Sequence, residues 1–315
     1  MKIAVLLLVH KNLKQVKRLL SVLQHENIDI FIHIDKKCPF GESDIKNGLP
    51  FKNIWFTEKR FSVGLYEFSM IKAEEALIET ALKHGKYSYF ILLSGQCCPI
   101  KSMDYIYSFL SQNYPKPFIE IVSEKEGNYV KKSLNSVYIN KKFKLKTYAF
   151  LKKHFSYKGY RLLRYLPGGI AKINSGIKQL FVGSPKKRLQ NMGITGCCGS
   201  QWWILPDTVV KHALGMMKNK PFCSAISDVF SCDETFFQTA IMASPYKDLL
   251  VFNENNDYLN RKWYFVFENG SHPYVLTQKD YKKLISSDML FARKFDINCD
   301  AKILDLLDET VHKSV

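Results

Sequence analysis

Acidic residues are absent from about a quarter of this chain. Between Glu126 and Asp207 lie 80 residues that contain sixteen Lys or Arg and no Asp or Glu. The rest of the 315-residue chain carries 30 basic residues (46 − 16) and 29 acidic ones, so nearly all of the +17 net charge comes from this segment. With 46% apolar and 14% aromatic residues, the chain has ample material for a packed core, which excludes a wholly disordered protein.

Long apolar runs are also missing. No stretch approaches the roughly 20 uninterrupted apolar residues that cross a bilayer. The N-terminal run over residues 3–9 ends at His10-Lys11 without a small-x-small cleavage site, which indicates a first buried strand rather than a signal peptide. We therefore expect a cytoplasmic chain without a membrane anchor, attached at most peripherally to the inner face of the membrane.

Several common motifs are absent as well. The eight cysteines include no C-x-x-C spacing, which argues against a zinc knuckle or a dithiol redox site and favours buried, reduced thiols. No G-x-G-x-x-G follows the first strand and no G-x-x-x-x-G-K-[ST] occurs anywhere, so neither a standard dinucleotide site nor a P-loop is indicated.

What is present is an alternation of buried strands and helices. Strand-like apolar runs and helical spacings follow one another at 3–9 (strand), 13–23 (helix), 29–35 (strand), 68–83 (helix), 87–93 (strand), 105–111 (helix) and 118–122 (strand). After residue 200 the pattern is a Trp-rich strand, a helix and a second helix from about Asp233. This order predicts an α/β fold whose central sheet is mostly parallel, Rossmann-like and covered on both faces.

Polar residues follow three of the expected strands. In parallel sheets of this kind, ligands bind beyond the carboxyl ends of the strands. We therefore expect one rim of the sheet to bind a nucleotide through His10, Lys11, Asp35, Ser94, Gly95 and Gln96.

Four segments, taken in order, are similar to motifs of one enzyme family. They are His10-Lys11 with IHIDKK at 32–37; FILLSGQCCPI at 90–100; GSQWW at 199–203 with SCDETFF at 231–237; and LFARKFD at 290–296. They are spread over roughly residues 1–300, and together they resemble the core-2/I-branching beta-1,6-N-acetylglucosaminyltransferase family, which is related to the protein xylosyltransferases. The resemblance is to a bacterial-type member without a membrane anchor.

The resemblance implies a GT-A-like fold and an inverting transfer of GlcNAc or a related sugar from a UDP-sugar to a glycan hydroxyl. It implies that no metal and no other cofactor is needed. This sequence departs from the family pattern in two places. Cys97 and Cys98 stand where the family has Asp and Tyr, and Leu65-Tyr66-Glu67 stand where many members have Trp-Gly-Gly.

An inverting transfer needs a base for the acceptor hydroxyl. The resemblance assigns this role to Glu234, the Glu of Ser-x-Asp-Glu. A second interpretation is structural, because Ser231 and Glu234 also have the spacing of a capping box that opens a helix.

The leaving nucleotide diphosphate needs positive charge. The family's basic pair corresponds to Arg293 and Lys294, which the apolar neighbours of LFARKFD place on a packed element rather than on a solvated surface. The alternative, a metal held by Asp-x-Asp, is poorly supported because His33-Ile34-Asp35 lacks the first carboxylate. We expect no metal site.

The remaining candidates bind sugar. Indole rings stack on sugars and amides bond to hydroxyls, so we expect contacts from Ser200, Gln201, Trp202 and Trp203, with at least one tryptophan in the core. The resemblance adds Glu120 as a carboxylate for sugar hydroxyls, His272 near a phosphate position, and Cys97 beside the nucleoside.

The basic segment over residues 127–206 interleaves cations with aromatic residues, which admits three interpretations. These are nucleic-acid binding, an amphipathic element on an anionic membrane, and a solvated basic loop. No nucleic-acid motif accompanies the segment, so we expect no nucleic-acid partner and favour the membrane or the acceptor.

We expect a single transferase domain over residues 1–315. Its half at 1–125 binds the nucleotide-sugar, and its half at 126–315 carries the catalytic base, the acceptor site and the basic segment. The expected role is synthesis of cell-surface polysaccharide or glycoconjugate from a glycan or glycolipid acceptor. The competing hypothesis is a non-catalytic polyanion- or carbohydrate-binding protein on a transferase-like scaffold, and the loss of the family Asp at Cys97 keeps this alternative open.

Overall fold

The central sheet is built around the first apolar run of the chain. The computed structural model describes residues 1–122, 128–138, 178–253, 257–267 and 273–312. The sheet has the order β3-β2-β1-β4-β7, with strands β1 (Ile3–Val9), β2 (Ile28–Ile34), β3 (Ile54–Phe56), β4 (Tyr89–Ser94) and β7 (Ile204–Pro206). All pairings are parallel except that of β4 with β7, which confirms the predicted mostly parallel α/β sheet.

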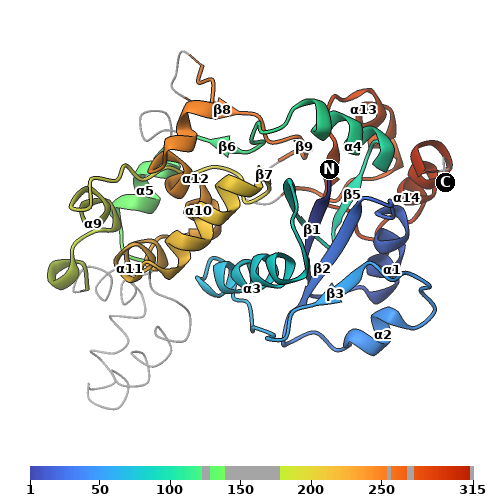
Figure 1. The fold of residues 1–315 in the computed structure, drawn as a ribbon, viewed down its shortest axis with the longest axis horizontal. Coiled ribbons are helices and arrows are strands. Elements are labelled where there is room, and N and C mark those ends of the chain that lie inside the picture. The colour runs from blue at the N-terminus through green and yellow to red at the C-terminus, as the bar shows by residue number, and fades with distance from the viewer. Residues whose placement is uncertain (123–127, 139–177, 254–256, 268–272, 313–315) are drawn as a thin grey trace, which may run out of the picture.

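Helices cover both faces of this sheet. In Figure 1, α1 (Leu13–Val22) and α3 (Ser69–His84) lie on opposite sides of the strands, and α3 contacts both β1 and β2. The other helices of this half are α2 (Glu42–Lys46) and α4 (Met103–Gln112). All seven residues of β1 are buried because both faces of the strand are covered, which explains its uninterrupted apolar sequence.

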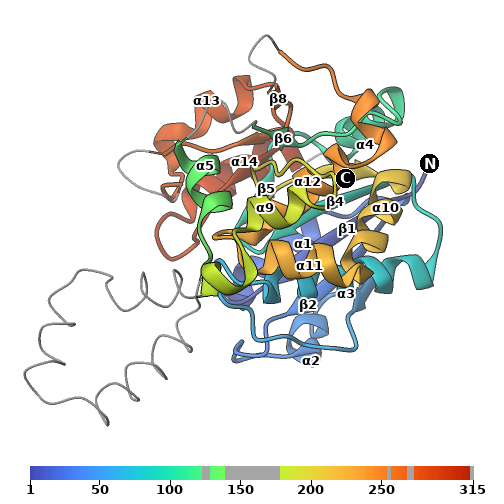
Figure 2. The same cartoon turned by 90° about the vertical axis from the view of Figure 1, so that its left-hand side faces the viewer.

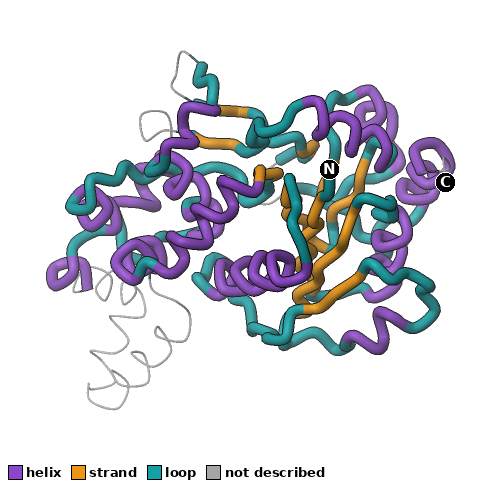
Figure 3. Tube along the Cα trace, viewed as in Figure 1, coloured by secondary structure: helices purple, strands orange, loops and turns teal. Residues whose placement is uncertain are grey.

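The second half of the chain is mainly helical among the residues described. In Figure 3 the strands of the central sheet lie in the right half with helices around them, whereas the left half is mainly helix and loop. In order, the helical elements up to residue 249 are α5 (Asn128–Asn135), α9 (Pro185–Gln190), α10 (Asp207–Lys218), α11 (Lys220–Ser227), η1 (Cys232–Glu234), α12 (Phe236–Met242) and η2 (Pro245–Leu249). In Figure 2, α10 and α11 lie in front of the sheet on the same side as α3, and α10 contacts α3.

Two small sheets carry further candidate residues. One pairs β6 (Glu120–Ile121) with β8 (Tyr258–Leu259), and the other has the order β5-β10-β9, with β5 (Cys97–Pro99), β9 (Trp263–Tyr264) and β10 (Phe291–Arg293). The chain then closes with η3 (Gln278–Asp280), α13 (Tyr281–Ser286), α14 (Lys302–Leu307) and η4 (Asp308–His312). The main hydrophobic core runs from Ile3 to Phe291, and a smaller one joins Cys98 to the C-terminal helices.

Some predicted elements differ from the structure. The helix expected from Asp233 starts at Phe236, after the 3-10 turn η1, and α11 was not predicted at all. The expected strand at 118–122 is regular only over β6. No described helix combines the length and the apolar character needed to span a bilayer. Much of the basic segment over 127–206, for which an amphipathic element was one interpretation, lies outside the described residues, at 139–177.

Candidate active site

The carboxyl ends of three parallel strands lie level at one edge of the sheet. In the register, Val9 of β1 pairs with Ile34 of β2, and Leu8 of β1 pairs with Ser94 of β4. The residues that follow, His10, Asp35 and Gly95, therefore leave the sheet at the same edge. The structure thus brings the three polar groups that follow these strands to one rim.

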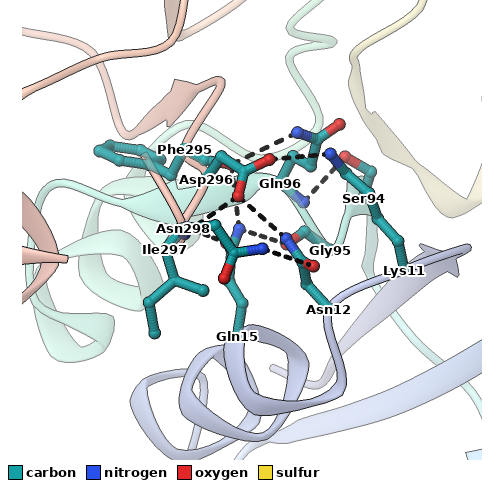
Figure 4. A network of polar contacts seen from close by, with 10 residues as sticks. All are labelled: Lys11, Asn12, Gln15, Ser94, Gly95, Gln96, Phe295, Asp296, Ile297 and Asn298. Atoms are coloured by element: carbon teal, nitrogen blue, oxygen red, sulfur yellow. Dashed lines mark hydrogen bonds and ion pairs between the residues drawn. The ribbon is translucent and has the colours of Figure 1, made fainter. Parts of the chain in front are cut away.

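Gln15 of α1 fastens this rim to the C-terminal segment (Figure 4). Its Nε2 donates to the carbonyls of Gly95 (2.8 Å) and Phe295 (3.1 Å), and its Oε1 accepts from the N–H of Ile297 (2.8 Å). The Phe295 N–H also donates to the carbonyl of Gln96 (2.9 Å). Because Gln15 is buried, these bonds fix the Ser94–Gln96 turn against the strand that precedes Phe295.

Lys11 forms an ion pair at the same junction (Figure 4). Its Nζ lies 2.9 Å from Asp296 Oδ2, and Asn12 Nδ2 donates to Asp296 Oδ1 (3.1 Å). The hydrogen bond from Lys11 is the main reason that the pKa of Asp296 is lowered. Lys11 is thus a half-exposed, paired cation at the rim.

The Asp35 carboxylate accepts hydrogen bonds from nearby backbone N–H groups. Its Oδ1 accepts from the Lys37 N–H (2.8 Å) and its Oδ2 from the Val63 N–H (3.2 Å), with Lys37 Nζ 3.7 Å away. Asp35 is 5% exposed. In this structure its carboxylate holds the turn after β2 against the loop at Val63.

The rim is electropositive around His10. Burial lowers the pKa of His10, and the charge of Lys11 lowers it further. The Asp35 carboxylate opposes this decrease in pKa, while Arg293 and Lys37 add to it. Cations from three separate segments therefore surround one imidazole, which favours an anionic ligand at this edge.

Arg293 lies at the end of β10, opposite Cys97 of β5. Its guanidinium carbon is 4.2 Å from the ring centroid of Trp202, and its Nε is buried without a hydrogen-bond partner. Burial lowers the pKa of Arg293, while Cys97, Glu234 and Asp233 oppose that decrease. Among the described residues neither Arg293 nor Lys294 forms an ion pair.

Glu234 ends the turn η1 and is partly exposed. Its N–H donates to the backbone carbonyl of Ser231 (3.0 Å), and the Ser231 hydroxyl makes no capping bond. Ser231 has φ 56°, and α12 begins only after Thr235. The capping-box interpretation is therefore wrong, since this Ser and Glu belong to a separate turn before the helix.

Gly199 brings Glu120 and Glu234 together through their backbones. Its N–H donates to the Glu234 carbonyl (2.8 Å), and a Cβ at Gly199 would lie 1.8 Å from the Glu120 carbonyl oxygen. Only glycine fits this close approach. The Glu120 carboxylate itself forms an ion pair with Arg261, whose guanidinium lies over Phe265.

The two tryptophans of GSQWW have different environments. Trp203 is fully buried and its ring centroid is 4.6 Å from that of Phe237, so its ring has no exposed face on which a sugar could stack. We correct the expected sugar contact of Trp203 to a core position. Trp202 is 4% exposed, with one face under Arg293. Ser200 is also buried, and its Oγ accepts from the Trp202 N–H (3.3 Å).

Two buried carboxyls near the turn η1, Glu74 and Asp233, were not predicted as site residues. Glu74 of α3 is fully buried, and its Oε1 accepts from Gln201 Nε2 (3.1 Å). Burial, and then the charge of Glu234, raise the pKa of Asp233 to about 7, against backbone N–H donors and Arg293. A signal was available for Glu74, because it shares the apolar stripe of α3 with Ile71 and Leu77, three residues away on either side.

The remaining candidates contribute less to the geometry. Cys97 is buried, with Sγ 3.6 Å from Ser94 Oγ. None of the eight cysteines, all of which lie in the described ranges, forms a disulfide; six are buried, as expected, while Cys299 is exposed. His272 lies outside the described residues. In the described part of the chain, no three His, Cys, Asp or Glu side chains form a group that could hold a metal ion.

The fold and the basic rim at its strand ends define a GT-A-like glycosyltransferase scaffold. The family model described as "Branch: Core-2/I-Branching enzyme" matches residues 3–289, and the chain belongs to this family. That membership confirms the predicted family; the fourth segment, at 290–296, lies just beyond the matched residues.

Known relatives agree with this assignment at low identity. The chain is 23% identical to xylosyltransferase 2 of Canis lupus familiaris over 329 residues, which are 98% of this chain and 33% of that protein. It is 24% identical to the Rattus norvegicus xylosyltransferase 2 over 330 residues. It is also 24% identical to beta-1,3-galactosyl-O-glycosyl-glycoprotein beta-1,6-N-acetylglucosaminyltransferase 4 of Mus musculus, over 99% of this chain and 66% of that protein. The chain spans about a third of the length of the xylosyltransferases that it matches.

Proposed function

We propose that this protein is an inverting glycosyltransferase that moves GlcNAc or a related sugar from a UDP-sugar to a glycan hydroxyl. The observation that carries the proposal is the position of Arg293. Arg293 is half-buried with its Nε buried, it forms no ion pair among the described residues, and the charge of the partly exposed Glu234 acts on its guanidinium. A cation and a base that interact electrostatically are the pair of charges that this reaction requires.

In the proposed reaction, Glu234 takes the proton from the acceptor hydroxyl. The hydroxyl oxygen then forms a bond to the anomeric carbon from the face opposite the nucleotide. The bond between that carbon and the diphosphate oxygen breaks, and the electron pair leaves with UDP. Arg293 and Lys294 stabilise the charge that develops on the diphosphate, since a guanidinium donates to two phosphate oxygens at once and an ammonium acts as a point charge.

We assign the other charges and polar groups of the rim to the donor. His10, Lys11 and the Ser94–Gln96 turn lie where strands of a parallel sheet present a nucleotide site. Gln201 and Glu120 belong to segments that meet the Glu234 turn at Gly199, and they are assigned to the sugars. Fixed cations take the place of a divalent ion in this proposal, so transfer proceeds without a metal.

The test of this function is a donor panel assayed with and without EDTA. We expect release of UDP from one UDP-sugar, an inverted anomeric configuration in the product, and no loss of rate in EDTA. Glu234→Gln is expected to lower kcat by about 10²- to 10⁴-fold, because proton transfer in the transition state is lost. Asp248→Asn, a carboxylate change in η2, is the matched control. Absence of turnover together with tight UDP or glycan binding would favour the non-catalytic binding protein instead.

We also propose peripheral attachment to an anionic membrane, where glycolipid acceptors of cell-surface polysaccharide are found. The described part of the basic segment supports this placement. Leu180 and Phe181 are 86% and 85% exposed, and the nearby Lys186 and Lys187 contribute positive charge. Exposed apolar residues next to cations are typical of elements that lie in the membrane interface.

A further inference from the structure

Glu74 is fully buried, and the proposed chemistry does not use it. Its Oε1 accepts from Gln201 Nε2 (3.1 Å), but its Oε2 has no hydrogen-bond partner. Burial raises the pKa of Glu74 well above its usual value. The hydrogen bond from Gln201 opposes this effect, and the charge of Asp233 adds to it. An ionised carboxylate that is buried without a cation lowers the stability of the folded state.

Asp233, on the neighbouring turn η1, has a buried carboxylate oxygen that lacks a hydrogen-bond donor. It is 7% exposed, and its Oδ1 is buried without a hydrogen-bond partner. It belongs to η1, which contacts α3, the helix of Glu74. An unpartnered acceptor on η1 therefore lies in the same buried region as an oxygen of Glu74 that becomes a donor when protonated.

The other titratable and charged groups around the two carboxyls do not favour ionisation of Glu74. Cys232 is buried, and its pKa is raised by burial and then by the charges of Asp233 and Glu74, so its thiol stays neutral. Arg293 interacts electrostatically with Asp233 and Glu234, and it is not among the causes that shift the pKa of Glu74. Among the residues that the structure describes, no cation forms an ion pair with Glu74.

We propose that Glu74 is a positioning residue held as a neutral carboxylic acid, which accepts from Gln201 through Oε1 and donates through Oε2–H to Asp233. In this way a single side chain of α3 orients both the GSQWW segment and the turn that carries Glu234. The positioning role rests on the proposed function, whereas the protonation of Glu74 does not.

Thermal unfolding tests the protonation without any activity. A carboxyl that stays protonated in the folded state but ionises in the unfolded chain destabilises the fold as pH rises above about 4.3. Gln cannot ionise and keeps both hydrogen-bonding functions. We therefore expect the Tm of Glu74→Gln minus that of the wild type to increase between pH 4.5 and 8, by about 2 °C or more per pH unit. A flat or decreasing difference would overturn the proposal.

Glu75→Gln is the matched control for this measurement. Glu75 occupies the next position of the same helix, where its carboxylate lies 2.7 Å from Lys72 Nζ. Its replacement removes an ion-paired carboxylate and is expected to give no increase in the Tm difference with pH.

The rate of transfer tests the positioning role. We expect Glu74→Gln to retain most of kcat, and Glu74→Leu to lose about ten- to a hundredfold because the site is displaced. Gln keeps a donor and an acceptor at this position and Leu keeps neither, so retention of kcat in Glu74→Gln together with its loss in Glu74→Leu assigns the effect to the two hydrogen bonds. Equal losses of kcat in both variants would refute the positioning role while leaving the thermal result to stand alone. Absence of transfer in the wild type would instead count against the proposed function.

Discussion

The guanidinium of Arg293 lies 4.2 Å from the ring centroid of Trp202. The two residues are 91 positions apart and come from two of the segments that carry the family resemblance. The indole of the buried Trp202 covers one face of the guanidinium. In the proposed function, Trp202 therefore contributes to donor binding through Arg293.

Substitution of Trp202 tests this relationship. Trp202→Leu is expected to weaken UDP binding by about 3- to 30-fold, since a partly desolvated cation–π contact contributes roughly 0.5–2 kcal/mol. Trp202→Phe keeps a ring face and should lose less. Isothermal titration with UDP measures both. Phe56→Leu removes the ring under Lys46, a comparable contact at 5.0 Å elsewhere in the fold, and should leave the Kd unchanged. Equal affinity of Trp202→Leu and the wild type would contradict the role of the indole.

Gly199→Ala should uncouple the Glu120 strand from the Glu234 turn. The added Cβ would meet the Glu120 backbone carbonyl at 1.8 Å, and backbone on both sides leaves little room to relax. We expect a loss of roughly 2–4 kcal/mol in the free energy of unfolding, measured with urea.

The control for this substitution is Gly215→Ala in α10. No atom lies within 4 Å of a Cβ built at Gly215, so alanine should stabilise the helix by about 0.5–1 kcal/mol. A stability of Gly199→Ala equal to that of the wild type would show that the two segments can separate at no cost.

His33 makes stability depend on pH. Its Nε2 accepts from the Phe61 N–H (2.9 Å), and burial is the main cause that lowers the pKa of His33 to about 4. The unfolded chain binds this proton near pH 6.5, so the folded state loses stability as pH falls from 6.5 to 4. The upper bound of this loss is about 3 kcal/mol.

Urea unfolding at a series of pH values measures this loss. His33→Gln is expected to show a smaller decrease in stability between pH 6.5 and 4 than the wild type. His212→Gln is the control, because His212 Nε2 faces the Ala240 carbonyl (3.2 Å), a contact that a protonated ring keeps. An unchanged decrease in His33→Gln would assign the acid sensitivity to other groups.

Membrane attachment is tested at Leu180 and Phe181. Leu180→Ser/Phe181→Ser should reduce co-sedimentation with vesicles that contain phosphatidylglycerol, because the exposed apolar pair can no longer insert. Val251→Ser changes an equally exposed apolar residue (86%) elsewhere and should bind as the wild type does. Binding should also fall with salt and be weak on phosphatidylcholine alone. Lack of binding to anionic vesicles at low salt would remove the membrane from the proposal.

The parallel sheet and its rim could be predicted from the sequence because their signals are local. A strand covered on both faces is an unbroken apolar run, as in β1, and polar residues at its end mark where it leaves the sheet. The same local reasoning placed the pair Arg293-Lys294 on a packed element, and Phe291 and Phe295 are indeed fully buried.

Local signals failed where partners come from distant segments. The spacing of Ser231 and Glu234 satisfies a capping box, yet the left-handed backbone at Ser231 starts a separate turn before α12. A short motif cannot report that geometry. The Gln15 bonds that tie Gly95 to Phe295 likewise span 280 positions of the chain and have no signature in any one segment.

The sequence by itself determined the fold class, the family and the edge of the sheet where the charged residues gather, because apolar periodicity and contiguous motifs carry that information. Only the tertiary structure decided the environments of the site residues. Trp203 is buried in the core, whereas its neighbour Trp202 packs against Arg293. Glu74 is buried, and the charge of Asp233 acts on it. The physical reason is that a side chain's hydration, its pKa and its partners depend on what long-range packing places around it, and residue type and spacing do not contain that information.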